Sequence, residues 1–415
     1  MRAEFYKREQ CRLCGSKDLK LVIELAPTPP GNHFVSEDKL GLPQTSYPLE
    51  VYFCMTCHHL QLGHVLDPEI LYQKNYTYVS GTSPVFVKHL REYASEIIDR
   101  FAIPNDGLVI DIGSNDGTAL SFFKAAGYRV LGVDPAIEIV QAANAKGIQT
   151  LCEFFSLEVS KKYSPEFGKA ALINTHNTCA HIDDLKSVMQ GVHHWLADDG
   201  LFVMEVGYLV DVFENLWFDT IYHEHLDFHT VGPLLRFFQE SGFEVISIQR
   251  TSPQGGSIRL ISQKIGGPLK ADASVQALVR LENSLGLNKA ETFKNFNLRL
   301  NRVKESLSRL INDLKANGKT IAGYGAPTKA TTLLTYFDLG TALDFLVDDN
   351  PLKQDLFSPG HHIPVFSAEA LYSRKPDYLL ILAWNFADDI MKRNSAYKTQ
   401  GGRFIIPMPE PRVVN

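Results

Sequence analysis

Short apolar runs alternate with longer amphipathic stretches through the middle of the chain. Four of these runs predict buried strands, at Leu108–Ile112, Arg129–Val133, Ala171–Thr175 and Leu201–Glu205. Strands that alternate with helices are typical of a parallel, doubly wound sheet. We therefore expect an α/β domain over residues 68–266.

The C-terminal part repeats this rhythm after a long helical stretch, which we expect near Ala290–Ala316. Its predicted strands are Thr320–Gly323, Leu343–Val347, Tyr378–Ala383 and Arg403–Ile406. This pattern predicts a second, Rossmann-like α/β domain over residues 267–415. Residues 1–67 hold short loops and four of the six cysteines, which predicts a small separate domain.

Composition narrows the class of protein. A length of 415 residues favours two or three domains, because one hydrophobic core seldom serves so long a chain. A net charge of −6 without a basic stripe argues against a nucleic-acid partner. The chain has no apolar run of about 18 residues and no signal-peptide pattern at its start. We expect a cytoplasmic protein with no membrane partner; its oligomeric state stays open, and a monomer is compatible.

The cysteines of the N-terminal region form two CxxC pairs, Cys11 with Cys14 and Cys54 with Cys57. Each pair offers two thiolates on one tight turn, and two such turns complete a tetrahedral zinc site. A closed site of four cysteines leaves no position for a substrate, so the expected zinc is structural. The alternatives are free or redox-active cysteines, or a nearby histidine in place of one cysteine.

The first predicted strand of the middle region ends in a glycine turn that leads into a helix. Gly113 and Gly117 allow the backbone to approach a ligand closely. Asp111, just before the turn, suits a cationic amino-acid ligand better than a pyrophosphate. Asp134 ends the next strand, about 20 residues on, where an acid suits the hydroxyls of a ribose. The pattern predicts S-adenosylmethionine; a nicotinamide cofactor is the alternative, although its GxGxxG pattern is missing.

Glu153, Phe154 and Phe155 follow the third strand region, where apolar rings usually flank an adenine. We expect Glu153 and Phe154 to contact the cofactor. The alternative is that the two phenylalanines belong to the core.

Two polar segments are candidates for the catalytic site. Asn177 and His181 follow a predicted strand, at the sheet edge where open α/β sheets bind ligands. Tyr222, Glu224 and His225 belong to a titratable run within an apolar stretch, and its spacing differs from that of the helical zinc motif. A histidine of this run is a candidate general base. Glu224 would either orient that histidine or contact a sugar hydroxyl. The alternative is a solvated surface.

A second glycine turn opens the C-terminal domain and leads to Pro327 and Lys329. A helix N-terminus together with a lysine suits a phosphate group. We hypothesise that this domain binds the nucleotide diphosphate of a substrate, with Trp384 and Asn385 lining the same cleft. The alternative is a nucleotide fold that serves only as support.

Taken in order, these motifs resemble those of the nucleotide-sugar C-methyltransferases that make branched deoxysugars. The resemblance spans nearly the whole chain and rests on the four cysteines, the 111–117 turn, residues 177–181 and 222–225, Gln254–Arg259 and Gly323–Lys329. It implies a small zinc-binding domain, a class I (Rossmann-like) methyltransferase core and a C-terminal Rossmann-like domain.

The resemblance also implies a chemistry. The substrate would be a (d)TDP-linked 4-keto deoxysugar, methylated next to its ketone. His225 would be the base, with His181 as a further catalytic candidate. Tyr222, Glu224 and Asn177 would lie around the sugar, Asn177 and Tyr76 near the cofactor, and Lys329 on the nucleotide. C-3 is the expected position, and C-5 remains an alternative. An oxidoreductase that acts on nucleotide sugars and a non-catalytic zinc-anchored protein are the rival functions.

Overall fold

The computed structural model describes residues 4–73, 78–101 and 103–414. Its largest sheet has seven strands in the order β12-β13-β10-β9-β6-β7-β8. In chain order these are β6 (Leu108–Ile112), β7 (Arg129–Asp134), β8 (Thr150–Cys152), β9 (Ala170–His176), β10 (Leu196–Gly207), β12 (Phe243–Thr251) and β13 (Ser257–Lys264). All five residues of β6 are buried, as expected for a strand covered on both faces. The four predicted strands are confirmed, and β9 and β10 extend beyond their predicted ends.

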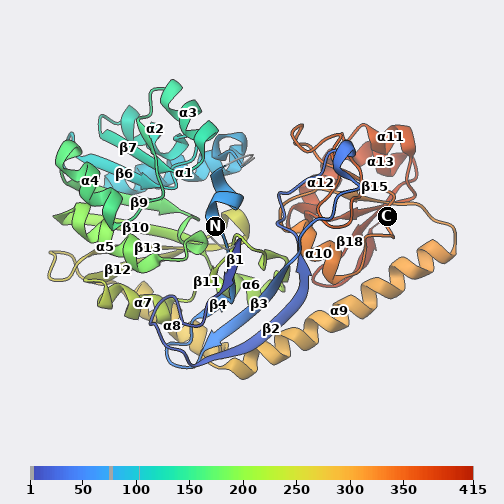
Figure 1. Ribbon diagram of the computed structural model, residues 1–415, viewed down its shortest axis with the longest axis horizontal. Helices are drawn as coiled ribbons and strands as arrows, with labels where there is room; N and C mark the ends of the chain where they lie inside the picture. The colour runs from blue at the N-terminus through green and yellow to red at the C-terminus, as the bar shows by residue number, and fades with distance from the viewer. Residues whose placement is uncertain (1–3, 74–77, 102, 415) are drawn as a thin grey trace.

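Strands β6 to β10 pair in parallel, whereas β13 lies antiparallel between β10 and β12. Helices cover both faces of the sheet (Figure 1). They are α1 (Pro84–Arg100), α2 (Thr118–Ala125), α3 (Ile137–Ala145), α4 (Leu157–Phe167), α5 (Leu185–Trp195), α6 (Leu209–Asn215), α7 (Val231–Glu240) and α8 (Ala273–Ser284). The expected α/β class with a class I methyltransferase core is confirmed.

The N-terminal region forms two small sheets. One pairs β1 (Phe5–Lys7) with β5 (His64–Leu66); the other has the order β11-β4-β3-β2. Its strands are β2 (Leu19–Thr28), β3 (Tyr47–Cys54), β4 (Leu60–Leu62) and β11 (Asp227–Phe228). β11 comes from the middle of the chain and follows the titratable run at residues 222–225 directly. The N-terminal sheet therefore holds one end of the candidate catalytic segment.

The C-terminal region forms a six-stranded sheet, β16-β15-β14-β17-β18-β19, which is parallel except for β19. Its strands are β14 (Ile321–Tyr324), β15 (Phe345–Val347), β16 (Val365–Phe366), β17 (Tyr378–Ile381), β18 (Arg403–Ile406) and β19 (Arg412–Val414). Its helices are α10 (Ala330–Tyr336), α11 (Ala370–Arg374), α12 (Ala387–Arg393) and α13 (Ser395–Thr399). This is the second α/β unit that the strand pattern predicts.

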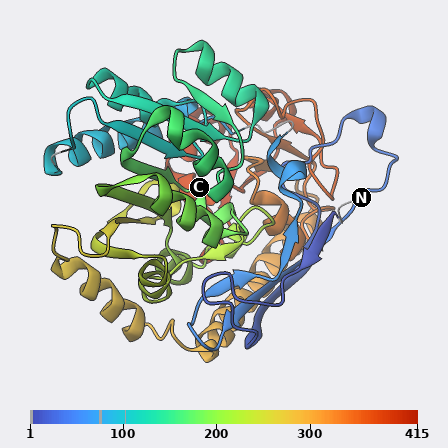
Figure 2. The ribbon, with the colours of Figure 1, turned by 60° about the vertical axis from the view of Figure 1, so that its left-hand side comes forward.

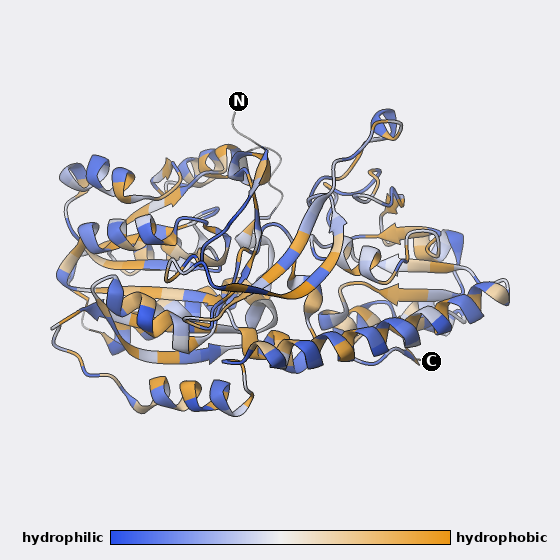
Figure 3. Ribbon diagram, turned by 60° about the horizontal axis from the view of Figure 1, so that its bottom comes forward, coloured by the Kyte–Doolittle hydropathy of each residue, from blue (hydrophilic) through white to orange (hydrophobic). Residues whose placement is uncertain are grey.

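Helix α9 (Ala290–Ala316) leads into this region and matches the expected long helix. Hydrophobic and hydrophilic residues alternate along it (Figure 3), and the buried ones recur every three or four positions, at Phe293, Phe296, Leu300, Val303, Leu307 and Ile311. The N-terminal strands run beside it (Figure 2), and Asn297 Nδ2 donates to the Val22 carbonyl at 2.7 Å. Within the described residues, no helix is both long and apolar enough to cross a membrane.

Arg12 joins the N-terminal region to the core. Its side chain is unexposed, and Nη1 donates to the carbonyls of Leu62 at 2.8 Å and Leu226 at 3.1 Å. Its Nε donates to Asp183 Oδ1 at 3.0 Å. Asp227 lies beside it, unexposed and 2.6 Å from His59 Nε2. Arg12, which lies between Cys11 and Cys14, thus contacts the Leu226 carbonyl next to the candidate catalytic run.

We predict that Arg12→Ala lowers the free energy of unfolding by roughly 3–5 kcal/mol, because the buried Asp227 carboxylate loses the cation beside it. Urea denaturation of both variants measures this. Arg8→Ala is the matched control: Arg8 pairs with Asp183 at 2.8 Å but is partly exposed, so about 0–1 kcal/mol is expected. Zinc content checks that both variants keep the metal. Equal losses in the two variants would contradict the role given to Arg12.

Candidate active site

A cavity of about 1020 Å³ opens where the three parts of the molecule meet. Asn32 lines it from the N-terminal region, and Lys329 from the C-terminal region. The core contributes Asp111, Asn177 and Glu224, from the ends of strands and the loops that follow them. Ligands of open α/β sheets bind at this carboxyl edge, so the cavity lies where the strand order predicts a site.

The glycine turn between β6 and α2 has the backbone that its sequence requires. Gly113 and Gly117 have φ values of +71° and +77°, which favour glycine. A Cβ at Gly113 would lie 2.1 Å from Thr178 Oγ1, so this position has no room for a side chain. The turn and the segment that follows β9 are therefore in direct contact.

Two carboxyl groups lie behind this turn. Burial raises the pKa of Asp111 to about 8, and the Asn174 amide, which donates to Oδ1 at 2.6 Å, opposes the shift. Asp134 accepts backbone N–H groups from Asn115 and Ala136, each at 2.9 Å. Burial raises its pKa as well, and these two bonds oppose the rise. Asp134 is therefore oriented at the strand end, with lone pairs left for the hydroxyls of a ribose.

The cavity carries buried polar atoms that suit a bound cofactor. Asn177, with φ of +54°, accepts from Ser257 through Oδ1 at 3.3 Å. Its Nδ2 and the hydroxyl of Ser114 are buried without a partner among the described residues. Buried donors of this kind usually mark a missing ligand or water. These atoms, with Asp111 and Asp134, fit the amino-acid and ribose parts of S-adenosylmethionine.

The expected adenine neighbours also line the cavity. Phe154 is 37% exposed and its ring is not part of the core, whereas Phe155 is buried and stacks against Trp195. Glu153 accepts from Lys162 at 2.8 Å and Tyr163 at 3.1 Å, which lowers its pKa although burial opposes this. The Glu153 and Phe154 assignment thus stays a prediction that the geometry permits. Tyr76 lies outside the described residues.

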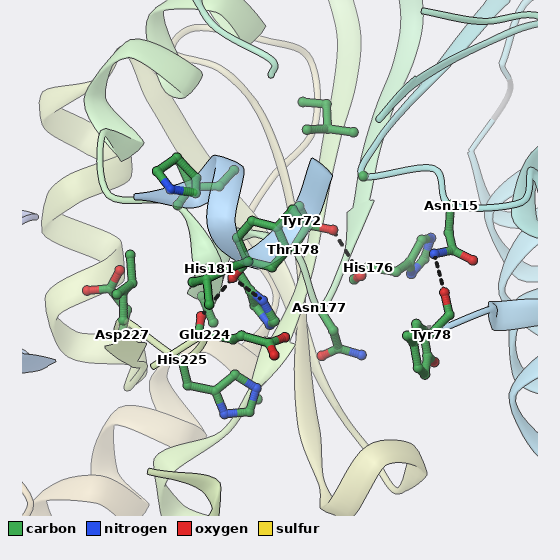
Figure 4. A pocket seen from close by; sticks show the side chains of 18 of the residues that line it. Tyr72, Tyr78, Asn115, His176, Asn177, Thr178, His181, Glu224, His225 and Asp227 are labelled. Atoms are coloured by element: carbon green, nitrogen blue, oxygen red, sulfur yellow. Dashed lines mark hydrogen bonds between the residues drawn. The ribbon is translucent and has the colours of Figure 1, made fainter. Parts of the chain in front are cut away.

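His225 lies within a group of rings at the other end of the cavity (Figure 4). Its Nδ1 is 2.8 Å from the Thr220 carbonyl, so this nitrogen carries the proton and donates. Its Nε2 then carries the lone pair and accepts a hydrogen bond from the Tyr222 hydroxyl at 3.0 Å. The His181 ring stands edge-on at 5.0 Å, and its Nδ1 is 3.1 Å from the Tyr72 hydroxyl. Three of the predicted catalytic residues, His225, Tyr222 and His181, therefore lie together at this end of the cavity.

Burial gives these rings unusual protonation. It lowers the pKa of His225 to about 4, an effect that the Thr220 carbonyl opposes and the charge of Lys329 strengthens. Burial, aided by His225, also takes the pKa of His181 well below its usual value. Both imidazoles are therefore neutral near pH 7 and able to accept a proton.

Glu224 lines the same cavity as Asn177 and His225 (Figure 4). Burial raises its pKa to about 7, while the Asn32 amide and the charge of Lys353 oppose that rise. Asn32 Nδ2 donates to Oε1 of this carboxyl at 3.0 Å. A carboxyl that titrates near neutral pH can exchange a proton or accept a hydroxyl of a substrate.

Lys329 lines the cavity but has partners within the protein. Its Nζ is 3.3 Å from Oδ2 of the unexposed Asp219, and it donates to Asn385 Oδ1 at 2.8 Å. It also lies 5.4 Å from the centre of the Trp384 ring, whose Nε1 donates to Asp219 at 2.8 Å. Asp219 offsets much of the positive charge, so Lys329 is a weaker phosphate ligand than the sequence suggests.

The four cysteines form the expected cluster. Their sulfur atoms all lie within 4.8 Å of one another, with Cys11 and Cys57 at 3.5 Å and Cys14 and Cys54 at 3.6 Å. Zinc bound to four thiolates at about 2.3 Å requires sulfur separations of about 3.8 Å, so the cluster fits this metal. His59 contacts Asp227 instead of the cluster, which removes it as a ligand.

Sequence reasoning missed several residues that build this site. Asn32, Arg12 and Asp219 contact the candidate segment from outside it or from its start. The turn of Pro29–Gly31 just before Asn32 was the one available signal, because such turns bring backbones close together. Arg12 and Asp219 have no local signal, since their partners lie far away in the sequence.

The comparisons with known proteins cover nearly the whole chain. Family models match as a putative zinc binding domain at residues 11–72, a methyltransferase domain at 86–248 and a C-methyltransferase C-terminal domain at 252–409. The chain is 37% identical to the C-methyltransferase NovU of Streptomyces niveus over 98% of this chain and 97% of that protein. These matches leave the oxidoreductase and the non-catalytic scaffold without support.

Solved structures resemble the chain more loosely. The PH0226 protein of Pyrococcus horikoshii OT3 covers 45% of this chain and 95% of its own, with 15% identity and a TM-score of 0.37. Magnesium protoporphyrin IX methyltransferase of Synechocystis PCC 6803 covers 43% of this chain and 83% of its own, with 15% identity and a TM-score of 0.34.

We predict that the binding of S-adenosylmethionine releases a proton from the Asp111 carboxyl to solvent. The free Asp111 carboxyl is protonated below its pKa of about 8, and a cationic ligand favours the ionised form. At about pH 6, calorimetry in buffers of different ionisation enthalpy should detect close to one released proton. Adenosine, which lacks the ammonium group, and the Asp111→Asn variant should release far less. Release that is the same in Asp111→Asn would contradict the assignment.

Proposed function

Because the chain belongs to the family of S-adenosylmethionine-dependent C-methyltransferases, we propose that it methylates a nucleotide-linked 4-keto deoxysugar. The methyl group would be added to a carbon next to the ketone, with C-3 favoured. The observation that carries this proposal is the neutral His225 in the shared cavity, with its lone pair on Nε2 and Tyr222 3.0 Å away.

Carbon methylation needs a carbon nucleophile. The cofactor, when bound, supplies an electrophilic methyl group. A ketone acidifies the C–H bonds beside it, and a base that removes this proton leaves an enolate. In this proposal His225 Nε2 takes the proton, and Nδ1 keeps its own proton through the bond to the Thr220 carbonyl at 2.8 Å. The Tyr222 hydroxyl donates to this nitrogen at 3.0 Å; once Nε2 has taken the proton, the hydroxyl would be able to donate to the developing oxygen charge.

The remaining polar groups fit the sugar and the nucleotide. Glu224 and Asn177 both line the cavity, where they would contact sugar hydroxyls (Figure 4). Lys329 and Asn385 line the cavity from the C-terminal region, where the diphosphate would lie. Because Asp219 would compete with a phosphate for Lys329, the lysine would help to orient the substrate but would contribute little to its affinity.

A division into domains belongs to the same proposal. Residues 1–67 would bind zinc, 68–266 would bind the cofactor, and 267–415 would hold the nucleotide. The separate N-terminal, central and C-terminal sheets support this division, although β11 links the first two.

We predict that His225→Gln lowers solvent-deuterium exchange next to the ketone by about 100-fold or more, because exchange requires the base. NMR of a TDP-4-keto deoxysugar in D2O with S-adenosylhomocysteine measures this without methyl transfer. His223→Gln is the matched control: His223 Nε2 lies 3.2 Å from the Tyr47 carbonyl, on the N-terminal sheet. Unchanged exchange in His225→Gln would remove His225 as the base.

A further inference from the structure

We propose that Asn32 is a positioning residue that orients the Glu224 carboxyl and makes this orientation depend on the docked C-terminal domain. The inference rests on the proposed function for its meaning in catalysis, but not for its test. It concerns a residue of the N-terminal region that lies 192 positions before its partner.

The hydrogen bonds around Asn32 define the direction of its amide. The Thr328 hydroxyl donates to Asn32 Oδ1 at 2.9 Å. The opposite atom of the amide, Nδ2, therefore points to the core and donates to Glu224 Oε1 at 3.0 Å. The Asn32 side chain thus bonds to both neighbours. Its acceptor oxygen bonds to Thr328, and its donor nitrogen bonds to Glu224. If Thr328 moved away, the amide would lose the contact that fixes which end faces the carboxyl.

The backbone contacts around Asn32 are too close to be incidental. A Cβ on Gly31 would lie 2.2 Å from the Thr328 carbonyl oxygen, so only glycine fits at this contact. Two residues after Asn32, the Phe34 ring lies 5.4 Å from Lys353 Nζ. Val35 then forms an antiparallel bridge with Phe357. In Figure 1 this N-terminal segment extends to the C-terminal unit near β15. Asn32 is therefore held at a tight junction.

The surroundings of Glu224 make its carboxyl sensitive to such a contact. Burial raises its pKa to about 7, and the Asn32 bond and the Lys353 charge are the two opposing influences. Lys353 donates to the Ala326 carbonyl at 2.9 Å, and burial lowers its own pKa. Among the described residues, further titratable groups near this segment are Tyr72, His181, Tyr222, His223, His225 and Lys329. Both opposing influences come through contacts with the C-terminal domain, directly or through Asn32.

This arrangement links substrate binding to the state of the site. The proposed nucleotide contacts lie on the C-terminal domain, next to Thr328. When that domain is docked, Asn32 favours the ionised Glu224, which can accept a sugar hydroxyl. Without the Thr328 contact, the amide is no longer held with its donor end toward Glu224, and the carboxyl then keeps its proton to higher pH. Glu224 would therefore be set for the sugar only in the assembled site.

The test follows the protonated carboxyl of Glu224 by infrared spectroscopy. Protein labelled with ¹³C-glutamate is titrated from about pH 5 to 9 without substrate, and Glu224→Gln identifies the band. We expect Asn32→Ala to raise the midpoint by about one to two pH units, because the ionised carboxylate loses a hydrogen-bond donor. Thr328→Val should raise it less, and Thr328→Ser, which keeps the hydroxyl, should leave it unchanged.

Asn32→Asp is a second variant of the same shape, in case Asn32→Ala fails to fold. It replaces the donor by a negative charge, so the midpoint should rise further. A wild-type midpoint in Asn32→Ala or Asn32→Asp would overturn the positioning role. A wild-type midpoint in Thr328→Val would overturn the link to the C-terminal domain. Because no methyl transfer is measured, failure to methylate a sugar would count against the proposed function alone.

Discussion

The architecture depends on one constraint: the segment 218–227 belongs to the core but is held in place by the regions on either side of it. At its start, Asp219 accepts from Trp384 at 2.8 Å and the Ile221 carbonyl accepts from Thr332 at 2.8 Å. At its end, Arg12 donates to the Leu226 carbonyl at 3.1 Å and His59 contacts Asp227 at 2.6 Å. The residues between these anchors, Tyr222 to His225, carry the proposed chemistry.

This anchoring explains why a structural zinc site and a second α/β unit accompany a methyltransferase core. The zinc cluster stabilises the turns that carry Arg12 and His59, and these side chains hold the segment. The C-terminal unit closes the other side and buries the cavity. Burial in turn raises the pKa of Asp111 to about 8 and of Glu224 to about 7, and lowers that of His225 to about 4. Desolvation is thus the common cause of these three pKa shifts.

Local patterns in the sequence predicted the features that depend on interactions between residues close together in the chain. The buried strands, the long helix α9, the glycine turn at Gly113 and the four-cysteine cluster all follow from periodicity or spacing, and the structure confirms them. Asp219, Arg12 and Asn32 could not be found in this way, because their partners lie 165, 214 and 192 positions away. The partial neutralisation of Lys329 by Asp219 has the same origin, since the motif shows the lysine but not the acid beneath it.

The central claim is that the assembled cavity methylates carbon next to a sugar ketone. Incubation with S-adenosylmethionine carrying a ¹³C-methyl group and a panel of TDP-4-keto deoxysugars, followed by NMR of the products, tests it most directly. The account predicts a new carbon-bound methyl group on a ring carbon adjacent to C-4. A methyl group on oxygen or nitrogen, or no transfer to any member of the panel, would contradict it.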